Sequence, residues 1–222
     1  MSPVGESDRP PLRADAERNR ARILEAARSL FAERGLDVPI EEIARRAGVG
    51  NATLYRRFPT RDALISASFE HKLAEYAKAA EEALRAPEAW TGFCTLVEHI
   101  CAMQAADQGV KDVLTMSFPG GAGLEEQARK AAQDVAELIR RAQAEGKLRP
   151  DVVPEDLGLL LMANAGVVQG MRDAAPEAWK RFVAFMIDAF RADRAGPLPE
   201  PPTPSQMEEA RQRLVSTRSQ ER

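Results

Sequence analysis

The sequence predicts an all-α protein in which a small N-terminal helical domain precedes a larger helical domain. Apolar residues recur at intervals of three and four through most of the 222 residues, which is the period of an amphipathic helix. Glycines and prolines interrupt this pattern where helices would end or begin. No segment alternates polar and apolar residues between hairpin turns, so no strand is expected.

The composition is that of an ordinary globular protein, with 44% hydrophobic and 29% charged residues. The N-terminus lacks the apolar core of a signal peptide, and no apolar run is long enough to span a bilayer. We therefore expect a cytoplasmic protein with no membrane contact. Cys94 and Cys101 are seven residues apart in a helical pattern, too far along one helix for a disulfide, and are expected to be reduced.

Residues 1–14 are polar and contain three prolines, which predicts a disordered arm. Residues 15–65 are expected to hold three short helices and the start of a fourth. The first helix ends at Gly35, and its apolar face consists of Ile23, Leu24, Ala27, Leu30 and Phe31. The second runs from Ile40 to a break at Gly48, and the third covers residues 53–58.

The remaining helices are expected in residues 66–195, after Thr60 has capped a long helix over residues 61–84. Prolines at helix starts and glycines at helix ends predict the segments 87–106, 110–117, 124–145, 154–174 and 176–192. A break is expected at residues 119–121. The proline-rich tail, residues 196–222, is expected to be disordered, except for a frayed helix over residues 207–215.

A helix-turn-helix motif is predicted within residues 40–61. Such a motif needs a small residue where the helices cross, a residue that accepts positive φ in the turn, and an aliphatic anchor on the second helix. Ala44, Gly48 and Leu54 supply these features. With Leu54 and Phe58 buried, the opposite face of the third helix presents hydrogen-bonding and cationic groups suited to base edges and phosphates.

The local charge agrees with contact to nucleic acid. The net charge of −3 divides into +2 for residues 1–65 and −5 for the remainder. Residues 43–61 contain five arginines and no acidic residue. A basic face on an otherwise acidic protein is expected where only one end of the molecule approaches phosphate.

Residues 15–65 resemble the DNA-binding domain of the TetR family of transcriptional regulators. The resemblance covers about a quarter of the chain and lies in Arg22–Ala27, Leu30–Gly35, Ile43–Val49, Thr53–Phe58 and Arg61–Leu64. It implies a three-helix DNA-binding domain followed by a larger helical domain that binds a small molecule and forms a homodimer. The chain would then be a sequence-specific repressor, released from a palindromic operator by its ligand and needing no cofactor.

The resemblance also implies eight contacts with double-stranded DNA: Asn51, Ala52, Thr53, Tyr55, Arg56, Arg57, Arg61 and Arg22. The first three would meet base edges or nearby phosphates. Tyr55 and Arg57 would contact phosphates, and Arg56 would reach bases or backbone. The two arginines outside the recognition helix would touch the DNA backbone.

Three positions depart from the family pattern. Pro39 stands where a Ser or Thr usually caps the second helix, and Gly50 replaces the usual Ser at the start of the recognition helix. Both are weaker caps. Arg57 replaces a small aromatic residue or histidine, which strengthens phosphate affinity and leaves operator specificity open.

Residues 66–195 contain no catalytic or metal-binding motif, so neither an enzyme nor a metal site is expected. Their soft and apolar side chains suit a pocket for a largely apolar ligand. The candidate pocket residues are Trp90, Phe93, Cys94, Val97, His99, Cys101, Met116, Met162, Asn164 and Gln169. The three polar members stand out because a buried polar group needs a partner, which a ligand can supply. For each apolar member, a place in the hydrophobic core is the stronger alternative.

The last two predicted helices, 154–174 and 176–192, are the candidate dimer interface. Ala163, Gly166 and Gly170 would allow close helix approach, and the second helix has several large apolar residues to bury. The alternative is that this surface belongs to the core of the monomer. Two other function classes, a helical enzyme with an incidental helix-turn-helix and an adaptor protein, have no motif in their favour.

Overall fold

The protein is built from helices, as the sequence predicts. The computed structural model describes residues 11–34, 36, 38–106, 122–207 and 209–210. Its helices are α1 (Pro11–Arg34), α2 (Ile40–Ala47), α3 (Asn51–Arg57), α4 (Arg61–Leu84), α5 (Ala89–Ala106), α7 (Ala122–Ala144), α8 (Pro154–Met171), α9 (Ala178–Ala189) and the short 3-10 helix η1 (Ala192–Arg194). Within the described residues no strand forms, and a single isolated bridge joins Leu148 to Arg191. The all-α prediction is confirmed.

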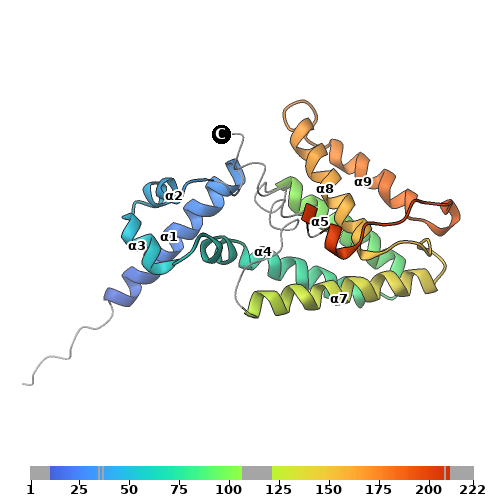
Figure 1. The fold of residues 1–222 in the computed structure, drawn as a ribbon, viewed down its shortest axis with the longest axis horizontal. Helices are drawn as coiled ribbons and strands as arrows, with labels where there is room; N and C mark the ends of the chain where they lie inside the picture. Colours follow the sequence, from blue (N-terminus) through green and yellow to red (C-terminus); the bar gives the residue numbers. More distant parts are fainter. Residues whose placement is uncertain (1–10, 35, 37, 107–121, 208, 211–222) are drawn as a thin grey trace, which may run out of the picture.

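Helix α4 connects two groups of helices. Helices α1, α2 and α3 gather at one end of the molecule, and α5, α7, α8 and α9 gather at the other (Figure 1). α4 packs against α1 in the first group and against α5 and α7 in the second. The predicted boundary between residues 65 and 66 therefore falls inside a continuous helix.

Two hydrophobic clusters follow the same division. The first includes Phe31, Leu54, Phe69 of α4 and Met103 of α5, and the rings of Phe31 and Phe69 stack at 5.9 Å. The second, larger cluster takes Ala83 and neighbouring residues from the end of α4, together with the inner faces of α5, α7, α8 and α9. Because α4 buries side chains in both clusters, its position depends on both groups of helices.

Several helix ends differ from the prediction. α1 begins at Pro11, so the last four residues of the expected arm are helical, whereas residues 1–10 lie outside the described part. Pro154 opens α8 as predicted, but α5 and α9 each begin two residues after the proline expected to open them. α8 ends at Met171, three residues early. The predicted helix at 110–117 and the break at 119–121 lie outside the described residues.

The corner between α4 and α5 is held by the last turn of α7. Arg141 donates hydrogen bonds to the carbonyl oxygens of Leu84 and Ala86, at the end of α4. The Glu145 carboxylate accepts from the backbone N–H groups of Ala89 at 2.7 Å and Trp90 at 3.1 Å, the first residues of α5. A residue distant in the sequence thus caps α5, which explains why α5 does not begin at Pro87. We call this arrangement the α7 clamp.

The tail follows a more defined path than the sequence predicts. Arg149 pairs with Asp151 at 2.6 Å and also donates to the carbonyl of Gly196 at 2.6 Å. A short helical turn then forms at residues 204–207, and Met207 is only 3% exposed. Residues 196–203 form no helix or strand, and the burial of Met207 stabilises the turn that follows them.

Candidate nucleic-acid interface

The turn between α2 and α3 is made by Gly48, with φ 63° and ψ 39°. Side chains other than glycine rarely adopt this left-handed conformation. The N–H of Val49 bonds to the carbonyl of Ala44 at 3.0 Å, which closes the end of α2. Arg22 of α1 donates a 3.0 Å hydrogen bond to the Gly48 carbonyl and so ties the turn to the first helix. The predicted helix-turn-helix is present, with Ala44, Gly48 and Leu54 in the expected places.

Helix α3 has one buried face and one exposed face. Leu54 is fully buried and Phe58 is 4% exposed, so these two residues anchor α3 on the rest of the first cluster. Six of the predicted DNA-contacting residues occupy the remaining surface of α3: Asn51, Ala52, Thr53, Tyr55, Arg56 and Arg57 are exposed or half-buried. The face thus presents amide, hydroxyl, phenol and guanidinium groups to solvent.

The N-terminal caps are as weak as the sequence suggests. Neither Pro39 nor Gly50 makes a side-chain cap hydrogen bond to α2 or α3. Thr60, in contrast, accepts a 3.0 Å hydrogen bond from the N–H of Ala63, which confirms it as the cap of α4. The first residue after this cap is Arg61, which therefore starts α4 directly after the turn that follows α3.

Arg22 and Arg61 both have partners within the protein. Arg61 donates to the carbonyl oxygen of Leu36, in the connection between α1 and α2, and Arg22 donates to Gly48 as described above. Both side chains therefore join the helix-turn-helix to neighbouring elements. This role was not anticipated from the sequence, because the bonded residues are 25 or more positions apart.

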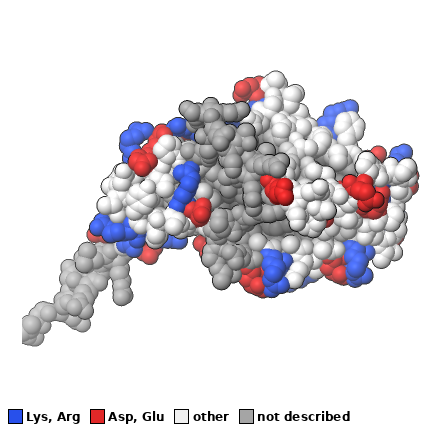
Figure 2. Space-filling model, viewed as in Figure 1, with Lys and Arg blue, Asp and Glu red and all other residues white. Residues whose placement is uncertain are grey.

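The remaining arginines fall into two groups. Arg46 pairs with Glu33 at 2.6 Å and Arg45 with Glu42 at 3.3 Å, so α2 carries balanced charges. The hydrogen bond from Arg46 holds the pKa of Glu33 below its usual value. Within the described residues, neither Arg56 nor Arg57 pairs with a carboxylate, and Arg56 bonds only to Thr53, at 3.1 Å. On the face shown in Figure 2, basic and acidic side chains lie intermixed over the molecule. Arg22 of α1 and Arg61 of α4, like the two arginines of α3, bond to no carboxylate among the described residues.

The predicted ligand residues do not converge on one cavity. Phe93, Val97 and Cys101 are buried in the second cluster, where Phe93 stacks on Trp90 at 5.8 Å and meets Phe190 edge-on at 5.6 Å. The remaining members are dispersed: Cys94 and Met162 are half-buried, Gln169 is exposed, His99 faces the opposite side of α5, and Met116 lies outside the described residues. Burial raises the pKa of Cys94 to about 11 and that of Cys101 to about 12, so both thiols are protonated at neutral pH.

Asn164 of α8 forms a buried polar pair with Gln104 of α5. The Asn164 Nδ2 donates to Gln104 Oε1 at 2.9 Å, and Gln104 Nε2 donates to the carbonyl of Leu161 at 3.3 Å. Both side chains are at most 1% exposed, and Asn164 Oδ1 has no hydrogen-bond partner in the described part of the chain. Gln104 was not among the predicted residues, although a polar side chain inside an apolar helix was the signal that selected Asn164.

The outer face of α8 and α9 is apolar and open. Leu159 is 44% exposed and Phe185 is 60% exposed. A Cβ added at Gly166 or Gly170 would meet nothing within 4 Å. The guanidinium of Arg181 lies 4.9 Å from the Phe185 ring centre and covers one face of it. A second helical surface can therefore approach the α8 backbone closely.

Other kinds of site find no support in the described residues. No group of three or more histidine, cysteine, aspartate or glutamate side chains there is placed to hold a metal ion. None of the described helices is long and apolar enough to cross a membrane.

Known proteins resemble the chain along most of its length. Residues 23–67 match the family described as bacterial regulatory proteins, tetR family, and residues 85–192 match the family described as transcriptional regulator SbtR-like, C-terminal domain. No curated protein gives a significant match.

Three solved structures illustrate the likeness. A TetR transcription regulatory protein from Mycobacterium vanbaalenii is 36% identical, over 82% of this chain and 99% of its own, with a TM-score of 0.46. A TetR transcriptional regulator from Streptomyces coelicolor is 29% identical, over 78% and 98%, with a TM-score of 0.47. A TetR family transcription regulator from Marinobacter aquaeolei VT8 is 18% identical, over 81% and 99%, with a TM-score of 0.58, and so shares the fold.

Proposed function

The chain belongs to the TetR family of bacterial regulatory proteins and is a DNA-binding transcriptional regulator; from this premise we propose that it is a repressor that leaves a palindromic operator when a small molecule binds. Residues 15–65 form the DNA-binding domain in this proposal, and residues 66–195 form the domain for ligand binding and dimerisation. A protein that acts on chromosomal DNA works in the cytoplasm. No observation favours the alternatives of an enzyme or an adaptor.

The exposed face of α3 carries this proposal. It enters the major groove, where Asn51, Ala52 and Thr53 meet base edges, and Tyr55, Arg56 and Arg57 meet phosphates and bases. The support is chemical: Arg56 and Arg57 on this face lack a carboxylate partner among the described residues, whereas Arg45 and Arg46 of α2 are paired. Unpaired guanidinium groups are those that phosphate neutralises most favourably.

Arg22 and Arg61 act from the edge of this interface. A guanidinium has five N–H donors, so an arginine that holds a backbone carbonyl can still donate to a phosphate. Arg61 also stands at the positive end of the α4 dipole, which favours an anion nearby. Both residues therefore fix the orientation of the helix-turn-helix and contact the DNA backbone at the same time.

Dimerisation occurs through α8 and α9. The supporting observation is that Leu159 and Phe185 are exposed beside the small residues Ala163, Gly166 and Gly170. Two recognition helices related by a two-fold axis would read half-sites about 34–36 Å apart, or a multiple of that distance. One helix alone reads too few base pairs to select an operator.

The effector is a largely apolar molecule that binds among α5 and α8. The support is Asn164 Oδ1, a buried acceptor that lacks a donor within the described residues. A buried unsatisfied acceptor costs about 1–3 kcal/mol, which a ligand hydroxyl or amide would recover. Cys101, whose carbonyl lies 3.4 Å from Asn164 Nδ2, and Met162 of α8 are then the candidates for the apolar wall.

The test is selection of bound fragments from genomic DNA, followed by affinity measurements over a range of salt concentrations. We expect a shared palindrome, and a log affinity that falls with log salt by about 0.9 for each phosphate neutralised. The Arg56→Gln Arg57→Gln variant should lower that slope by about 2, whereas Arg45→Gln on α2 should leave it nearly unchanged. Fragments without a common sequence would contradict the proposal.

A further inference from the structure

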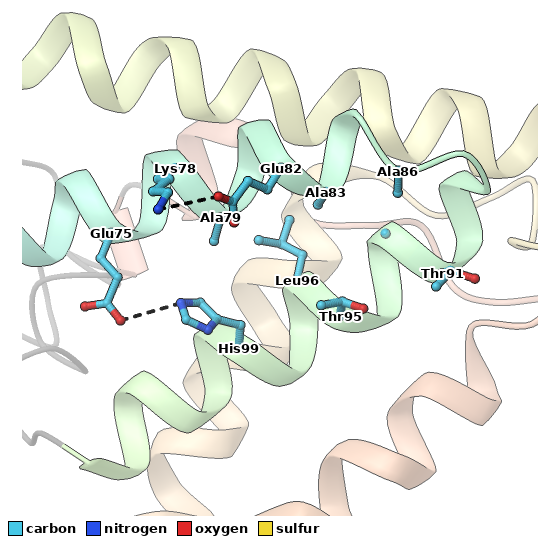
Figure 3. A pocket seen from close by; sticks show the side chains of 11 residues that line it. Glu75, Lys78, Ala79, Glu82, Ala83, Ala86, Thr91, Thr95, Leu96 and His99 are labelled. Carbon is cyan, nitrogen blue, oxygen red and sulfur yellow. Dashed lines mark ion pairs between the residues drawn. The ribbon is translucent and has the colours of Figure 1, made fainter.

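A groove with a volume of about 320 Å³ lies between α4 and α5 (Figure 3), and Asn164 is not among the residues that line it. Its floor is apolar and includes Ala79 and Ala83 of α4 and Leu96 of α5. Its volume is at the lower end of the range in which small molecules bind.

The groove is a wedge, because α4 and α5 touch at one end and diverge toward the other (Figure 3). At the narrow end, a Cβ added to Gly92 would come within 2.3 Å of the Ala83 carbonyl oxygen. Only glycine permits this approach of the two helices. At the wide end, Glu75 of α4 and His99 of α5 face each other.

The two facing groups at the wide end are close but make no hydrogen bond with each other. Glu75 Oε1 lies 3.6 Å from His99 Nε2, which is too long for a hydrogen bond. His99 Nε2 is buried and has no hydrogen-bond partner in the described part of the chain. The other Glu75 oxygen, Oε2, accepts from Lys72 at 3.0 Å, and this bond holds the pKa of Glu75 below its usual value. A ligand atom that can both donate and accept a hydrogen bond, such as a hydroxyl oxygen, would connect Glu75 Oε1 to His99 Nε2.

The charges of the groove are already balanced. Glu75 pairs with Lys72, and Glu82 pairs with Lys78 at 3.5 Å. A charged ligand would lose hydration on the apolar floor without gaining an uncompensated counter-charge. These observations favour a neutral ligand over an ammonium or a carboxylate.

We propose that this groove is a second binding site, which takes a neutral apolar alcohol. The side chains of Glu75 and His99, 40% and 41% exposed, move apart to admit the hydroxyl. The hydroxyl then donates to Glu75 Oε1 and accepts from the N–H of His99 Nε2, and its apolar chain covers Ala79, Ala83 and Leu96. The ligand thereby bridges α4 and α5 at the wide end of the wedge. This site is separate from the buried pair of Asn164 and Gln104, and its occupancy is measured without DNA.

The proposal is tested with probes of equal chain length: 1-hexanol, 1-chlorohexane, hexylammonium and hexanoate. Dissociation constants are measured by protein-observed NMR titration of the full chain. A hydrogen bond to a charged group corresponds to about a tenfold gain, so 1-hexanol should bind about tenfold tighter than 1-chlorohexane. It should also bind tighter than either ion. Equal binding of hexanol and chlorohexane, or tighter binding of an ion, would overturn the proposal.

Two variants locate the site. His99→Phe keeps a ring and removes Nε2, so it should reduce the preference for hexanol over chlorohexane. The matched control is His71→Phe, which changes the other histidine, on α4 and outside the groove lining. Ala79→Leu fills the floor and should weaken all four probes. Circular dichroism and thermal unfolding establish that each variant is folded. A hexanol preference that is undiminished in both His99→Phe and Ala79→Leu would place the alcohol elsewhere and overturn the assignment.

Discussion

The Arg22 guanidinium donates a 3.0 Å hydrogen bond to the carbonyl oxygen of Gly48, the residue whose left-handed backbone turns the chain between α2 and α3. The same guanidinium leaves no room above Gly48, because an added Cβ would lie 2.5 Å from Arg22 Nη2. The turn of the helix-turn-helix is therefore fixed by its own backbone and by a side chain of α1.

We expect Gly48→Ala to destabilise the protein by about 1–3 kcal/mol, because alanine is strained at positive φ and its methyl group displaces Arg22. The free energy of unfolding is measured by urea denaturation. The control is Gly196→Ala, where a Cβ meets nothing within 4 Å and little change is expected. Equal stability of the Gly48→Ala variant and the wild type would show that the turn tolerates a side chain.

Asn51 and Tyr55 should affect DNA binding in different ways. Asn51→Ala should change which bases are preferred, at about 1–3 kcal/mol for a lost base contact. Tyr55→Phe should weaken binding to all sequences alike, because a phosphate contact carries no base information. Selection of bound sequences from a randomised pool measures both effects. An unchanged preferred sequence for Asn51→Ala would mean that α3 enters the groove in another register.

Phe185→Glu should yield a monomer that has lost specific operator binding, because a charge would be buried where two copies of α9 meet. Analytical ultracentrifugation measures the mass in solution. Leu198→Glu is the matched control, because Leu198 is similarly exposed, at 57%, but lies in the tail. A wild-type protein that is monomeric, yet binds a palindrome tightly, would refute the proposed interface.

Glu145→Ala should lower stability by about 1 kcal/mol at neutral pH, the typical cost of losing a helix cap. The backbone N–H of Ala89 is the main cause of the lowered pKa of Glu145. A carboxylate with a lowered pKa in the folded state stabilises the fold above its unfolded pKa, and this contribution is lost as the pH falls through the folded value. The difference between wild type and variant should therefore shrink below about pH 4. Urea denaturation at several pH values measures it, and a difference independent of pH would exclude the cap.

The sequence predicted those features that are set by residues close together in the chain, and missed those set by contacts between distant residues. Ala44, Gly48 and Leu54 lie close together in the chain, and their spacing alone predicted the helix-turn-helix. The start of α5 could not be predicted, because Glu145 sets it from the end of α7. The pairing of Gln104 with Asn164 likewise joins helices 60 residues apart.

The sequence predicted which DNA-binding candidates lie on the exposed surface, but it did not predict the hydrogen-bond partners of Arg22 and Arg61. One buried face of α3 implied the opposite exposed one, and the six residues expected there do lie on it. The bonds of Arg22 and Arg61 to backbone carbonyls depend on the path of the chain in three dimensions. Pattern and composition contain no information on such contacts.

The α7 clamp fixes one end of α4, so a tilt of this helix moves mainly its other end. The C-terminal end of α4 is fixed by the bonds of Arg141 and Glu145 at the α4–α5 corner. Its N-terminal end begins at Arg61, directly after the turn that follows the recognition helix α3. A helix of 24 residues is about 36 Å long. A tilt of about 5° at the pinned end thus moves the other end by about 3 Å, close to the rise of one base pair along DNA. In the proposed dimer, a shift of this size would put the two recognition helices out of step with their half-sites.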